Sequence, residues 1–91
     1  MKYLTSGKQI IYPDDYKTKV DFLRKSQKWL ESKKAEGIIE CAYSHSAGGG
    51  FLIFNVNSHE ELVTQLIDFP LYPRSEFTVE PIIDFNKNSD I

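Results

Sequence analysis

The stretch IDFPLYPRSEFTVEP, residues 67–81, joins a helix-like apolar run to an alternating, strand-like run through Pro70 and Pro73. Proline lacks a backbone N–H and clashes with the preceding turn, so a helix that reaches Pro70 has to end there. From Phe77 onward, apolar residues recur at every second position, which is the period of a strand. The stretch therefore predicts a helix that turns abruptly into a last strand, and Pro81 inside that strand predicts an edge position.

A second signal marks where that helix begins. Ser58 followed by Glu61 forms a capping box, in which the serine hydroxyl accepts from an early backbone N–H and the glutamate reaches back. We therefore expect a helix from residue 58 to about residue 69. A strand is expected after this helix, and we expect one side of it to carry Phe77, Val79, Pro81, Ile83 and Phe85.

The first part of the chain predicts a strand and a longer helix. Residues 1–11 resemble a strand of moderate quality. A helix is expected over residues 14–36, because Asp14 or Asp15 can cap its start and Gly37 follows its last turn. One face of this helix is expected to carry, at spacings of three and four, Tyr16, Val20, Leu23, Gln27 and Leu30.

The segment between the two helices predicts a hairpin. Residues 38–46, IIECAYSHS, alternate imperfectly between apolar and polar positions and predict a strand. The glycine-rich AGGG after it predicts a turn, and residues 51–56, FLIFNV, predict the partner strand. Phe51 to Phe54 are apolar at consecutive positions, whereas an antiparallel strand with one solvated face alternates. Both faces of this strand are therefore expected to be covered.

The predicted element order is β-α-β-β-α-β, which is the ferredoxin-like arrangement of the α+β class. This antiparallel sheet carries both helices on one face and leaves the other face bare. Because the strand at 51–56 predicts a covered second face, we expect two such sheets to pack together in a homodimer or higher ring, a dimeric α+β barrel. The domain is expected over residues 1–85, followed by a polar tail over residues 86–91.

The composition restricts the partners. The chain has 91 residues, of which 41% are hydrophobic, and a domain this small hides its apolar surface most easily by self-association. Its formal net charge of −2 argues against nucleic-acid and anionic-membrane surfaces. No run approaches the ~20 apolar residues that cross a bilayer, and the only cysteine, Cys41, fits a reducing compartment. We expect a cytoplasmic protein that binds neither nucleic acid nor membranes.

The sequence FLIFNVNSHEELVTQLIDFPLYPRSEFTVEPI, residues 51–82, resembles the second half of muconolactone isomerases, small proteins of the dimeric α+β-barrel superfamily. Its most specific parts are Pro70-Leu71-Tyr72-Pro73 and the cap at Ser58. The resemblance implies proton transfer on an unsaturated lactone, in which a base removes one proton and an acid returns it. It also implies a pocket inside the barrel near a subunit interface, and neither a metal nor an organic cofactor.

The first half of the chain departs from that family's pattern. The family has glutamate-containing charged residues midway along the first helix and a tryptophan, histidine and arginine grouping on the second strand. This chain has Arg24-Lys25-Ser26-Gln27-Lys28 and Cys41-Ala42-Tyr43-Ser44 at those places. We therefore expect weak or absent activity on muconolactone.

Three residues are candidate catalytic groups. His45 and Tyr43 are two apart on one strand, so they share a face and could form an acid/base pair. The alternative is a histidine at a hairpin end that lies in solvent. Glu80 lies on the last strand, where a carboxylate facing the barrel could act as a base and one facing solvent could not.

Three others are candidate ligand-binding residues. Arg74 could hold a carboxylate or satisfy the carbonyls at the helix end, and Tyr72 could be a second polar anchor. Trp29 could be a platform for a ligand or pack in the core. Cys41 and His45 are ~13 Å apart along an extended strand, so no metal site is expected.

These observations leave two function classes open. One is an isomerase that moves a proton within a small lactone or aromatic-derived acid. The other is a non-catalytic small-molecule-binding or assembly module of the same fold. A ligand-sized cavity with a poised acid/base group would distinguish the first from the second.

Overall fold

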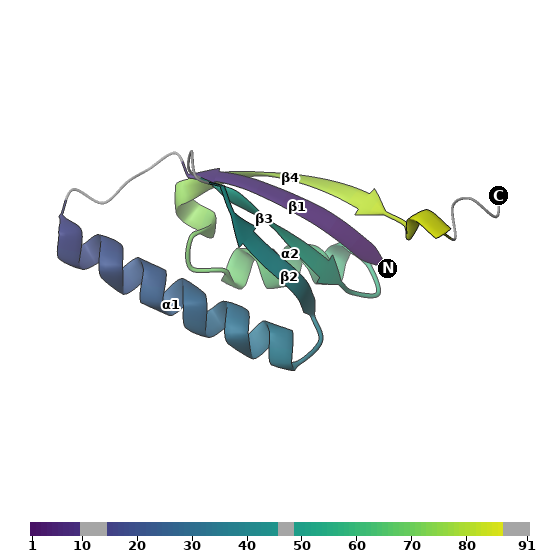
Figure 1. The fold of residues 1–91 in the computed structure, drawn as a ribbon, viewed down its shortest axis with the longest axis horizontal. Helices are drawn as coiled ribbons and strands as arrows, with labels where there is room; N and C mark the ends of the chain where they lie inside the picture. The colour runs from purple at the N-terminus through teal and green to yellow at the C-terminus, as the bar shows by residue number, and fades with distance from the viewer. Residues whose placement is uncertain (10–14, 46–48, 87–91) are drawn as a thin grey trace.

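The computed structural model describes residues 1–9, 15–45 and 49–86 (Figure 1). The predicted α+β fold with β-α-β-β-α-β order is confirmed. Its elements are β1 (Lys2–Gln9), α1 (Tyr16–Ala35), β2 (Ile39–Ser44), β3 (Gly50–Asn55), α2 (His59–Asp68), the short 3-10 helix η1 (Tyr72–Arg74) and β4 (Ser75–Ile82).

The four strands form one antiparallel sheet in the order β2-β3-β1-β4. The predicted hairpin is the β2–β3 pair, and β4 pairs with β1 alone at the other edge. Pro81 lies opposite Tyr3 on this edge strand, as predicted, where a missing N–H costs no hydrogen bond on the outer side. Figure 1 shows both helices on the same side of the sheet, so the sheet has a covered face and an open face.

Local capping signals fix the helix ends. Asp15 accepts from the backbone N–H of Thr18 at 2.7 Å, and this bond lowers the pKa of the Asp15 carboxyl below its ordinary value. Gly37 has φ 79° and lets the chain leave α1 in a left-handed turn. At α2, Ser58 accepts from the N–H of Glu61 at 3.1 Å. These caps agree with the sequence, whereas Asp14 and the predicted strand residues after Gln9 lie outside the described residues.

The core lies between the covered face and α2. Its buried apolar members are Tyr3, Ile39, Leu52, Phe54, Val56, Leu62, Leu66 and Phe69. α1 joins this core mainly through its C-terminal half, where the Trp29 ring packs on Phe69 at 4.9 Å between centroids. The indole Nε1 donates to the Asp68 carboxylate at 2.9 Å. This end of α1 is therefore tied to α2.

The inward face of α1 differs from the predicted one. The buried residue of the helix is Ser26, and Leu30 and Trp29 are half-buried. Tyr16 is 82% exposed and Leu23 is 49% exposed. The predicted helical period is therefore correct. The buried stripe of α1 is rotated relative to the predicted one, because Ser26 and not a large apolar side chain faces the sheet.

The last strand is shorter than predicted. Phe77 and Val79 pack against the core, which confirms their shared side. β4 ends at Ile82, and Ile83 and Phe85 lie beyond it in solvent. Most of the predicted polar tail, residues 87–91, lies outside the described residues. No helix within the described residues is long and apolar enough to cross a membrane.

Candidate functional site

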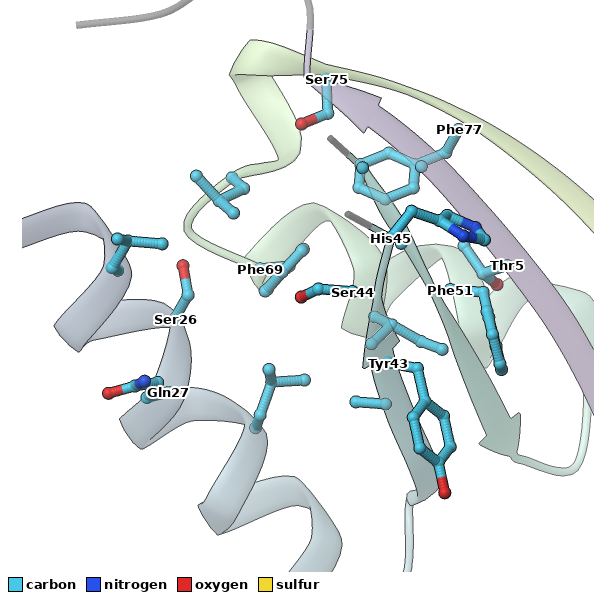
Figure 2. Close-up of a pocket in the computed structure, with 18 residues that line it drawn as sticks. Thr5, Ser26, Gln27, Tyr43, Ser44, His45, Phe51, Phe69, Ser75 and Phe77 are labelled. Atoms are coloured by element: carbon cyan, nitrogen blue, oxygen red, sulfur yellow. The ribbon is translucent and has the colours of Figure 1, made fainter. Parts of the chain in front are cut away.

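A cavity of about 390 Å³ lies between the covered face of the sheet and α1 (Figure 2). Its apolar wall comes from α1, the joint after α2 and the sheet, and includes Leu23, Leu30, Leu52, Phe69, Leu71 and Phe77. Side chains that can form hydrogen bonds interrupt this wall at Thr5, Ser26, Gln27, Ser44 and Ser75. The cavity is therefore mainly apolar with a few polar groups, the usual character of a small-molecule site.

The joint quoted at the start of the sequence builds one end of this cavity. The chain turns at Pro70, so Phe69 and Leu71 come to lie against the cavity, and β4 then begins directly with Ser75. The two prolines predicted this turn, but not that it would form one end of a cavity. The two prolines direct apolar side chains into a space that α1 leaves open.

Phe77 lies over Gly7, its partner on β1. A Cβ added at Gly7 would come within 2.5 Å of the Phe77 ring, so only glycine leaves this space to the ring. The ring also stacks on Tyr72, with their centroids 6.0 Å apart and an angle of 8° between the planes. Phe77 is thus held in a fixed position on the cavity wall.

Two buried hydroxyl groups lie on different elements beside the cavity. Thr5 belongs to β1 and is fully buried, and Ser26 belongs to α1 and is 5% exposed (Figure 2). Within the described residues neither Thr5 Oγ1 nor Ser26 Oγ has a hydrogen-bond partner. A buried hydroxyl without a partner costs about 1–3 kcal/mol. Both Oγ atoms have almost no accessible surface, so neither hydroxyl is open to a molecule in the cavity.

The candidate catalytic pair borders the cavity at the end of β2. Ala42 packs on the core and Figure 2 shows Ser44 pointing towards α1, so alternation directs Tyr43 and His45 to the open face. There the rings of Tyr43 and His45 lie 5.4 and 6.1 Å from Phe51. The two residues are brought together on one strand, and their rings lie on the far side of it from α1.

The third catalytic candidate, Glu80, lies apart from the cavity. Glu80 lies opposite Leu4 of β1. The residue before it, Val79, packs on the core, so the Glu80 side chain points to the other face of the sheet. Its exposed carboxylate is therefore on the open face. The structure does not bring it together with the residues that line the cavity.

The ligand-binding candidates surround the cavity without lining it. Arg74 lies over the Phe22 ring, with its guanidinium carbon 4.5 Å from the ring centroid. Tyr72 stacks on Phe77, and Trp29 packs on Phe69, as the core alternative predicted. No charged side chain is among the described residues that line the cavity. Within residues 1–9, 15–45 and 49–86, no group of three His, Cys, Asp or Glu residues could hold a metal ion.

Neither Thr5 nor Ser26 was predicted as a site residue, although Ser26 lies in the stretch that departs from the charged residues of the family's first helix. A signal for Ser26 was present, because it lies four residues after Phe22 and three before Trp29, inside an apolar stripe. A small polar residue in such a stripe marks a place where the helix leaves space. Thr5 shares a face with the buried Tyr3 two residues earlier, and that alternation placed it inside.

No family model and no curated protein sequence matches the chain. Solved structures do match it. Muconolactone isomerase is 16% identical with a TM-score of 0.81, over 92% of this chain and 90% of that one. The 5-chloro-2-hydroxyhydroquinone dehydrochlorinase from Burkholderia phenoliruptrix AC1100, solved in complex with 2,5-dihydroxybenzoquinone, is 19% identical with a TM-score of 0.76, over 96% and 98%. The chain therefore has the fold of muconolactone isomerase, as its sequence predicted.

Proposed function

We propose that the chain binds a small cyclic organic molecule in the cavity between the sheet and α1. The observation that supports this most strongly is the cavity itself, whose wall is mainly apolar with a few side chains that can form hydrogen bonds. The volume of about 390 Å³ is within the range of ligand pockets. The two structural neighbours are named for compounds built on a single oxygen-bearing ring, which suits a cavity of this size.

For the reaction, we propose proton transfer within the bound molecule. His45 is the candidate proton carrier, because imidazole exchanges protons near neutral pH and the residue borders the cavity. Tyr43 is the candidate second group. For this role the His45 ring would have to rotate away from Phe51 towards the cavity mouth. His45 comes directly after the last residue of β2, so the strand pairing does not hold it in place.

The alternative is a binding module without catalysis. It is favoured by the placement of the Tyr43 and His45 rings on the open face and of Glu80 beyond reach of the cavity. In this alternative the cavity holds its ligand through its shape and its apolar wall. The lone Cys41 supports a cytoplasmic location for either function.

We also propose that a second copy covers the open face. Leu4 and Ile53 pair across β1 and β3 on this face, and Tyr43 is 63% exposed beside them. An apolar sheet face of this kind packs on another sheet. Light scattering after size exclusion should give twice the 10.5 kDa of one chain, and a stable monomer at micromolar concentration would contradict the proposal.

A spectrophotometric assay with muconolactone and a thermal-shift screen of small ring compounds separate the two functions. Catalysis predicts turnover that is lost in His45→Gln while ligand-induced stabilisation remains. The binding module predicts stabilisation without turnover in both proteins. If no compound raises the unfolding temperature, the cavity is not a binding site and the first proposal fails.

A further inference from the structure

We infer that Phe85 of each chain fills a groove on a second copy of the same chain, at the end of the sheet where β1 begins and β4 ends. This inference rests on the proposal that a second copy covers the open face, and it names the side chain and the groove through which the copies meet. Three observations support it: the exposure of Phe85, the position of the groove, and the charges that line the groove.

Phe85 is held in solvent just past the end of the sheet. Ile82, the last residue of β4, lies opposite Lys2, the first residue of β1, so the chain continues beyond β1 from Ile83 onward (Figure 1). Ile83 is 58% exposed there and Phe85 is 81% exposed. The Asp84 carboxylate accepts from the backbone N–H two residues later at 2.9 Å, so Phe85 lies within a hydrogen-bonded turn. An aromatic ring presented in this way suits a partner surface.

A groove of about 710 Å³ lies beside Phe85, at the same end of the sheet. Its lining residues are Met1, Lys2, Asn55 and residues 81–84. Lys2 lies opposite Asn55 of β3 on one side and Ile82 of β4 on the other. The next residue, Tyr3, is buried in the core, so alternation places Lys2 and its two partners on the open face. The groove is therefore continuous with the face that a second copy is proposed to cover.

Twofold symmetry makes the contact between Phe85 and the groove reciprocal. In a symmetric dimer the same surface patch of both chains forms the interface, so each chain both gives and receives every contact. Phe85 directly follows Asp84, which lines the groove, so a twofold axis near this end of the sheet brings each Phe85 to the groove of the other chain. Met1 and Ile83 add exposed apolar surface there. Aromatic side chains that fill such pockets carry much of the energy of an interface.

The charges that line the groove also favour a second copy. Lys2 and Asp84 have opposite signs and line the same groove. A reciprocal contact can place the Lys2 ammonium of one chain beside the Asp84 carboxylate of the other, twice in each dimer. Lys2 holds Glu40 of its own chain at 3.0 Å, and an ammonium has three donors, so it can bind a second carboxylate. One chain thus supplies both the apolar anchor and the complementary charges.

Sedimentation equilibrium of the full chain and its variants tests the inference. Phe85→Ala should raise the dissociation constant of the dimer at least about tenfold, because it removes the aromatic anchor. Phe85→Leu keeps an apolar side chain and should raise the constant less. Ile83→Ser changes the wall of the groove and should also weaken the dimer. The matched control is Tyr16→Ala, which removes a ring that is 82% exposed at the start of α1 and should change the constant by less than about twofold.

Mixed dimers of carbon-13-labelled and unlabelled chain test the contact itself. Isotope-filtered nuclear Overhauser effects should connect the Phe85 ring protons of one chain to the methyl groups of Met1 and Ile83 of the other. A dimer whose dissociation constant is the same in Phe85→Ala, or is raised equally by Tyr16→Ala, would overturn the inference and leave the covered open face in place. A stable monomer at micromolar concentration would contradict both.

Discussion

Replacing Thr5 by valine should stabilise the ligand-free protein. Thr5 is fully buried at the centre of the sheet, and its hydroxyl has no partner among the described residues. Valine has nearly the same shape, favours strands, and puts a methyl group where the hydroxyl is. Removing an unsatisfied buried hydroxyl should raise the free energy of unfolding by about 1–3 kcal/mol. For a domain of this size, each kcal/mol raises Tm by roughly 4–8 °C.

The matched control is Thr5→Ser, which keeps the hydroxyl and removes a buried methyl group. It should lower the free energy of unfolding by about 1 kcal/mol. Calorimetry and urea unfolding should be run at equal protein concentration, because association would shift Tm. If Thr5→Val is less stable than the unaltered protein, the hydroxyl has a partner within the protein.

Three further changes test other parts of the structure. Gly7→Ala should lower stability by about 1–3 kcal/mol, because its Cβ would collide with the Phe77 ring, and adding Phe77→Leu should recover part of the loss in a double-mutant cycle. Ser58→Ala should cost about 1 kcal/mol by urea unfolding through loss of the α2 cap, and an unchanged midpoint would contradict this. Asp15 has a lowered pKa in the folded state, so its contribution is present above the ordinary value of 3.8 and is lost as pH falls through the lowered value. Acid unfolding of Asp15→Asn should lack this part of the pH dependence, and an identical profile would contradict it.

The fold was largely predictable because its signals are local. The cap at Ser58, the stop at Pro70 and the left-handed turn at Gly37 each depend on a few neighbouring residues, and all three were placed correctly. The edge position of β4 followed from Pro81 combined with the element order. Such signals act within one turn or one strand, so the sequence displays them directly.

The site was harder to predict because it depends on the rotation of α1 and on the space left beside the sheet. Leu23 was expected on the inner stripe and is half-exposed, whereas Ser26 is buried. The resemblance implied a pocket inside the barrel near a subunit interface, and the cavity of the single chain lies between the covered face and α1. Helical spacing gives the period of a stripe, but long-range contacts such as that between Trp29 and Phe69 determine which way it turns.

The central claim is that a ligand occupies the space between the sheet and α1, and adjacent residues of β3 test it most directly. Leu52 lines the cavity, whereas the side chain of Ile53 points to the open face. With methyl-labelled protein and a ring compound that raises the unfolding temperature in the thermal-shift screen, nuclear Overhauser effects should connect the ring protons to the methyl groups of Leu52 and Leu30. Contacts to Ile53 and Leu4 instead would place the ligand on the open face and contradict the claim.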